Sequence, residues 1–182
     1  MQEIRYAMVD GEKVPVLISD ENEALQAAKA ARRAIVGLWR EDGKENEWCA
    51  DTLITDVEDA DEEFLERIAR RHLGLPWTIC ETERLILREI AERDYEEIVK
   101  NHVDDGLDTA EKIAGYTKRH YEVFEFGFWA VEEKKSGNLA GVVGFRIPQD
   151  DAAGDVEDWL LSFDDENILD DTLELGYNIF PE

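Results

Sequence analysis

The sequence FGFWAVEEKKSGNLAGVVGFRI, residues 126–147, predicts a β-hairpin and decides the fold of the second half of the chain. Residues 126–133 and 139–147 are rich in aromatic and β-branched side chains, which favour strands. Between them, KKSGN at 134–138 is typical of a turn, because Gly137 and Asn138 adopt positive φ angles at little cost. The sequence therefore predicts two antiparallel strands here.

Three further elements flank the hairpin. RLILR at 84–88 predicts a strand before it by alternation, and TLELGYNIF at 172–180 predicts a strand after it. Two helical patterns lie between the first of these strands and the hairpin. One spans Tyr95 to Val103, and the other opens at Asp108, with Glu111 as its capping partner, and continues to Tyr121. This order predicts a sheet with two helices.

The first part of the chain alternates strand and helix signals. Short apolar runs at 14–18 and 35–39 enclose a helical pattern that Asp20 is expected to cap. A strand, a helix and a strand of this length form a parallel βαβ unit. A second amphipathic helix is predicted from about Asp61 to Gly74.

We therefore predict an α/β protein with two domains. The first, at 1–77, is a small βαβ domain, and LPW at 75–77 marks the boundary. The second, at 78–182, is α+β in character and contains a mixed sheet with two helices.

Charge excludes several classes of function. Of the 182 residues, 45 are acidic and 20 are Lys or Arg, so the formal net charge is −25. Such a chain repels phosphate backbones, and direct nucleic-acid binding is not expected. No stretch approaches the roughly 20 apolar residues that span a bilayer, and no signal peptide opens the chain. Two cysteines are too few for a disulfide framework, and the three histidines lack partners at metal-ligand spacing. We expect a cytoplasmic protein without membrane or metal binding.

Three segments in order resemble a known enzyme family. TERLILREIAERDYEEI at 82–98, the hairpin at 127–146 and LELGYNIFPE at 173–182 are similar to the first half of a GNAT-type N-acetyltransferase. The match is closest to the subgroup that acetylates ribosomal-protein N-termini, and it implies an incomplete GNAT-like mixed sheet. VLISDENEALQAAKAARRAIVGLW at 16–39 resembles the tail of a HAD-type phosphatase Rossmann domain. The D-x-D nucleophile motif of that family does not follow the first strand candidate, so no phosphatase is predicted.

The GNAT resemblance also implies a cofactor site. In that family a Gln/Arg-x-x-Gly-x-Gly/Ala loop follows the strand that 173–180 resembles, and its backbone N–H groups hold the pyrophosphate of acetyl-CoA. Here Glu182 ends the chain before such a loop, so we expect no cofactor and no acetyltransferase activity from this chain alone. Glu174 and Tyr177 match the family's ELGY strand. They are candidate catalytic residues only where additional sequence or a second chain completes the site.

The segment from Asp150 to Asp171 is the most acidic part of the chain, with ten carboxylates and no Lys or Arg. One interpretation is a solvated loop with a short amphipathic helix on the sheet. The other is a recognition surface, in which apolar anchors ringed by negative charge bind a basic partner. A calcium loop ranks lower, because DxDxDG spacing is absent. The candidate partner-binding residues are Asp150, Asp151, Asp155, Glu157, Asp158, Trp159, Phe163, Asp164, Asp165, Glu166, Asp170 and Asp171.

Two classes of function remain. In the first, the chain is a non-catalytic acidic binding module derived from a GNAT fold. It docks on a basic protein surface as an inhibitor or nucleic-acid mimic of a nucleic-acid-binding enzyme, in the manner of some anti-CRISPR proteins. In the second, it is part of an acetyl-CoA-dependent N-acetyltransferase. The unpaired edge of the final strand is also expected to permit self-association.

Overall fold

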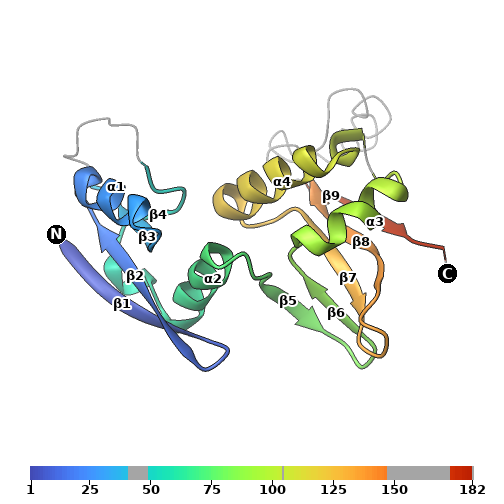
Figure 1. Ribbon diagram of the computed structural model, residues 1–182, viewed down its shortest axis with the longest axis horizontal. Coiled ribbons are helices and arrows are strands. Elements are labelled where there is room, and N and C mark those ends of the chain that lie inside the picture. Colours follow the sequence, from blue (N-terminus) through green and yellow to red (C-terminus); the bar gives the residue numbers. More distant parts are fainter. Residues whose placement is uncertain (41–48, 104, 147–172, 182) are drawn as a thin grey trace, which may run out of the picture. The chain divides into compact units, whose positions relative to one another are not determined.

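The computed structural model describes residues 1–40, 49–103, 105–146 and 173–181 of the chain (Figure 1). Within these residues the protein is a mixed α/β protein with two sheets and four α-helices, which confirms the predicted class. The chain divides into two compact units, Met1–Trp77 and Thr78–Glu182. Each unit has a hydrophobic core of its own.

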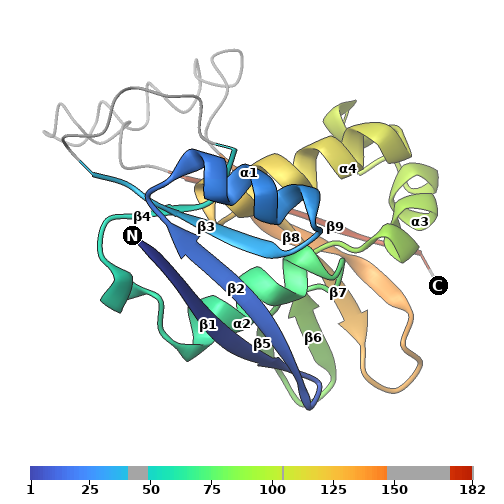
Figure 2. The same cartoon turned by 60° about the vertical axis from the view of Figure 1, so that its left-hand side comes forward.

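Unit 1 contains a four-stranded sheet with the order β1-β2-β3-β4. Its elements are β1 (Gln2–Val9), β2 (Glu12–Ser19), α1 (Asn22–Ala30), β3 (Ala34–Leu38), β4 (Leu53–Ile54), the 3-10 turn η1 (Val57–Asp59) and α2 (Glu62–His72). β1 is antiparallel to β2, β3 is parallel to β2, and β4 is parallel to β3. The predicted βαβ unit is therefore present as β2-α1-β3. α1 and α2 lie on opposite faces of the sheet (Figure 2).

The capping role predicted for Asp20 is wrong. The N-cap of α1 is Glu21, whose backbone N–H donates to Ser19 Oγ at 3.0 Å. The Asp20 carboxylate instead pairs with the N-terminal ammonium group of Met1 and, at 3.0 Å, with Arg40. These cations lower the pKa of Asp20, the ammonium group having the larger effect. Two cationic partners compete with the neutral backbone N–H groups of the helix for this carboxylate, which explains the outcome.

Unit 2 contains a five-stranded sheet with the order β5-β6-β7-β8-β9. Its strands are β5 (Thr78–Glu81), β6 (Leu85–Arg88), β7 (Phe128–Glu133), β8 (Leu139–Arg146) and β9 (Glu174–Ile179). All described neighbours are antiparallel, unlike the predicted mixed sheet. β7 and β8 form the predicted hairpin, and Gly137 has a φ of 72° in its turn.

The connection from β6 to β7 covers one face of this sheet. It contains η2 (Glu92–Asp94), α3 (Tyr95–Lys100), η3 (Asp105–Leu107), α4 (Ala110–Arg119) and the π-helical turn η4 (His120–Phe124). Ile98 of α3 and Ile113 of α4 are fully buried and belong to one cluster with Phe128, Ala130 and Val142 of the sheet. The opposite face receives neither helix, and we call it the open face.

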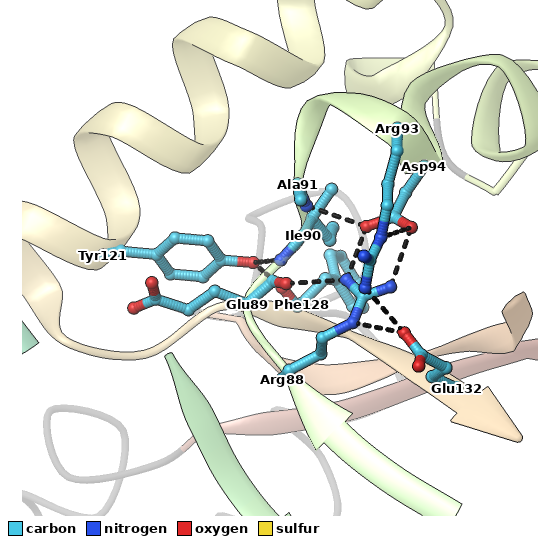
Figure 3. A network of polar contacts seen from close by, with 9 residues as sticks. All are labelled: Arg88, Glu89, Ile90, Ala91, Arg93, Asp94, Tyr121, Phe128 and Glu132. Carbon is cyan, nitrogen blue, oxygen red and sulfur yellow. Dashed lines mark hydrogen bonds and ion pairs between the residues drawn. The ribbon is translucent and has the colours of Figure 1, made fainter. Parts of the chain in front are cut away.

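A buried ion network ties β6 to this connection and to β7 (Figure 3). The Arg88 guanidinium binds both carboxylate oxygens of Asp94, at 2.6 and 2.9 Å, and Glu132 at 2.8 Å. Burial opposes the charge of Arg88, but the two carboxylates outweigh it and raise the pKa of Arg88. Asp94 also accepts the backbone N–H of Ala91 at 2.7 Å, which fixes the start of η2.

Tyr121 makes a second tie between the same elements (Figure 3). Its buried hydroxyl accepts the backbone N–H of Ile90 at 3.1 Å and donates to the carbonyl of Phe128. Burial raises the pKa of Tyr121 well above its ordinary value, so the hydroxyl remains a donor at all physiological pH values. The entry and exit of the helical connection are thereby joined.

Replacement of Arg88 tests the weight of the ion network. Arg88→Met leaves the buried Asp94 carboxylate without its bidentate partner, whereas Glu132 keeps its ion pair with Arg93. The change should lower the free energy of unfolding of unit 2 by about 3–5 kcal/mol. Lys100→Met is the control, because Lys100 pairs with Glu97 at 3.0 Å on the exposed surface. That change should cost less than about 1 kcal/mol. Equal losses for both variants in urea denaturation would contradict the structural role of Arg88.

Candidate binding surface

β9 forms an edge of the unit 2 sheet among the described strands, since it pairs with β8 alone. The backbone N–H of Phe180 donates to the carbonyl of Ala140 at 2.9 Å. Because backbone groups alternate in direction along an antiparallel strand, the even-numbered residues of β9 bond to β8. The N–H and C=O groups of Leu175, Tyr177 and Ile179 are consequently directed to the outer edge.

The side chains of these three residues form an apolar strip on the open face. Leu175, Tyr177 and Ile179 are 58%, 73% and 66% exposed. The register places Tyr177 beside Val143 and Leu175 beside Phe145. We call these five residues the β9 strip. Exposed apolar side chains that are contiguous on a sheet are typical of contact surfaces.

An ion pair joins β8 to β9 where β9 begins, on the face opposite the β9 strip. The Arg146 guanidinium donates to both carboxylate oxygens of Glu174, each at 2.9 Å. This pair lowers the pKa of Glu174, mainly through its hydrogen bonds. Arg146 ends β8 and Glu174 begins β9, so the pair fixes both ends of the intervening segment, 147–173.

The two candidate catalytic residues are not brought together. Glu174 and Tyr177 are three positions apart on one strand, and residues at odd spacing point to opposite faces of a sheet. Glu174 lies on the helix-covered face and Tyr177 on the open face. Period-2 alternation would have predicted this from the sequence. The candidate partner-binding residues, from Asp150 to Asp171, lie outside the described residues.

An open groove of about 950 Å³, which the sequence did not predict, lies at the other end of β9. It is lined by Arg84, Leu85, Arg93, Asp94, Glu97, Lys100, Glu133, Gly137, Asn138, Leu139, Ala140, Ile179, Phe180 and Pro181. Arg93 pairs with Glu132 at 2.8 Å and Lys100 with Glu97 at 3.0 Å, so neighbouring acids neutralise both cations. Its lining comes from four separate parts of the chain, and no local sequence signal marks it.

Metal binding and membrane insertion find no support in the described residues. No group of three or more His, Cys, Asp or Glu side chains there is arranged to hold a metal ion. None of the described helices has both the length and the hydropathy needed to cross a bilayer.

Comparison with protein-family models, with curated proteins and with solved structures finds no match to this chain.

The ion pair at the base of β9 predicts a pH effect. The side-chain carboxyl of Glu174 should titrate by NMR below its ordinary pKa, and Arg146→Gln should return the pKa toward that value. A lowered pKa in the folded state stabilises the protein above the ordinary glutamate pKa, and this contribution is lost as pH falls through the lowered value. An unchanged Glu174 titration in Arg146→Gln would show that the pair does not form.

Proposed function

We propose that this protein is an acidic protein-binding module that docks on a basic protein surface. The observation that carries the proposal is the Arg146–Glu174 pair, which fixes both ends of a segment with ten carboxylates and no Lys or Arg between 150 and 171. The segment carries this charge between two neighbouring strands of one antiparallel sheet. Apolar residues of that segment, such as Trp159 and Phe163, supply candidate anchors.

The net charge of −25 decides the chemistry of the partner. Long-range attraction by this negative charge accelerates association with a basic surface, whereas the same charge repels acidic surfaces. Basic protein surfaces are commonly channels that bind nucleic acids, since Lys and Arg neutralise phosphates there. An inhibitor or nucleic-acid mimic of a nucleic-acid-binding enzyme is therefore the proposed form of the activity, in the manner of some anti-CRISPR proteins.

A second candidate is an acetyl-CoA-dependent N-acetyltransferase completed by additional sequence or a second chain. The strand order of unit 2, with two α-helices between β6 and β7, supports a GNAT-derived fold. Both candidate functions assume such a fold. Two observations weigh against catalysis by the residues present. Glu174 and Tyr177 lie on opposite faces, and Arg146 lowers the pKa of Glu174, which makes it a weaker base.

Binding to purified basic enzymes tests the first candidate. We expect the full chain to bind at least one member of a panel of nucleic-acid-free nucleases and helicases, with affinity that falls as salt rises. The triple variant Asp164→Asn/Asp165→Asn/Glu166→Gln should weaken binding by roughly tenfold or more, because it removes three charges from the acidic segment. Biolayer interferometry over a salt series measures both effects.

A charge-matched control separates the acidic segment from net charge. Asp59→Asn/Glu62→Gln/Glu63→Gln removes the same charge from exposed positions of unit 1 and should change affinity by less than about twofold. Equal weakening by the two triple variants, or binding that salt does not affect, would contradict the proposal. Calorimetry with acetyl-CoA tests the second candidate, since micromolar binding by this chain would favour the transferase.

A further inference from the structure

We propose that two copies of this chain associate through the outer edges of their β9 strands, which pair antiparallel about a two-fold axis at Tyr177. This inference is independent of the function proposed above. It rests on the exposed edge of β9, on the β9 strip and on the distribution of charge along the strand.

β9 lacks the features that protect the other described edges from strand pairing. Natural edge strands are commonly short, bulged or interrupted by charged residues. In unit 1, β4 has two residues, and β1 carries Glu3 and Arg5 within its span. In unit 2, β5 has four residues and a register shift against β6. β9 has six residues that pair with β8 without a register shift.

The charge of β9 is also confined to one end. Glu174 is the only ionisable carboxylate in the strand, and Arg146 already holds it. Leu175, Tyr177 and Ile179 present uncharged side chains on the open face. A second copy of the same strand therefore meets no like charge opposite its own central residues.

One antiparallel register uses every outward-directed residue. With Tyr177 opposite Tyr177 of the second copy, Leu175 falls opposite Ile179 and Ile179 opposite Leu175. Each such pair exchanges two backbone hydrogen bonds, so the ladder gains about six. Pro181 has no N–H group and falls opposite Leu173, which ends the ladder. A shift by two residues loses at least one of these pairs.

The same register extends the apolar surface. Residues directly opposite in an antiparallel pair lie on the same face and contact each other. Leu175 then packs against Ile179 of the second copy, and the two Tyr177 rings are neighbours at the axis. The β9 strips of the two copies become one continuous apolar band, and lateral contact shields part of the side-chain surface that is exposed on β9 in a single copy.

Charge favours the antiparallel over the parallel arrangement. The acidic residues 150–171 precede Glu174, so antiparallel pairing places their two points of attachment about 20 Å apart along the strands. Parallel pairing would place them only about 5 Å apart. The Debye length is about 10 Å at 0.1 M salt, so salt screens charges at the larger separation more strongly than charges at the smaller one.

Sedimentation of the full chain over a concentration series tests the association. We expect a monomer–dimer equilibrium that tightens as salt rises, because both copies carry a charge of −25. Tyr177→Lys places two like charges at the axis and should raise the dimer Kd by roughly tenfold or more. Tyr6→Lys is the matched control, since Tyr6 is 60% exposed on β1, and it should change the Kd by less than about twofold.

Disulfide trapping tests the register. In a Cys49→Ser/Cys80→Ser background, Tyr177→Cys should cross-link two copies on mild oxidation. Hydrogen-bonded partners have Cα atoms about 5.5 Å apart, within disulfide range. Leu175→Cys should not cross-link, because the two copies of that residue lie at least about 13 Å apart.

Several outcomes would overturn the proposal. A chain that is monomeric at all concentrations excludes the dimer. If the dimer Kd increases as salt rises, charge attraction holds the dimer together instead of the β9 strip. Loss of the dimer in Tyr6→Lys would show that the dimer contact lies on β1. Cross-linking by Leu175→Cys without Tyr177→Cys excludes the register. A negative result for the dimer does not contradict binding to a basic partner, because the binding experiment tests residues 164–166 and not β9.

Discussion

The helices that join β6 to β7 pack on a single face of the unit 2 sheet, and this constraint determines the accessible surface of the unit. Side chains alternate between faces, so covering one face buries Phe128, Ala130 and Val142 and leaves Leu175, Tyr177 and Ile179 in solvent. The Arg88 ion network and the Tyr121 hydroxyl hold both ends of the helical connection in place. The same alternation directs the free backbone groups of β9 outward.

Local signals in the sequence predicted local structure well. Gly137 marked the hairpin turn, and Asp61 caps α2 by accepting the Phe64 backbone N–H at 2.8 Å. Contacts between distant residues were not predictable in this way. The position of Asp20 in the sequence predicts a helix cap, but in the structure its carboxylate pairs with Arg40 and with the ammonium group of Met1. Glu174 and Tyr177 were grouped by resemblance, although strand alternation separates them. The acidic partner-binding residues were proposed from composition, and they lie outside the described residues.

The two proposed surfaces respond to salt in opposite directions, because one depends on charge attraction and the other must overcome charge repulsion. Both involve β9, whose first residue, Glu174, follows the acidic segment in the sequence. Among the described strands, the edge formed by Leu175, Tyr177 and Ile179 is unpaired. In the proposed dimer, the points at which the two acidic segments attach to β9 would lie at opposite ends of the shared ladder. Two linked contacts of this kind raise the effective concentration at an extended basic surface.

Amide hydrogen exchange of β9, followed residue by residue by NMR, tests the arrangement of this strand most directly. The account predicts slow exchange for Gly176, Asn178 and Phe180 at every protein concentration, because their N–H groups are directed to β8. The amides of Leu175, Tyr177 and Ile179 should exchange rapidly in dilute solution and become protected in concentrated solution. Equal protection of both sets when dilute, or no gain with concentration, would contradict the central claim.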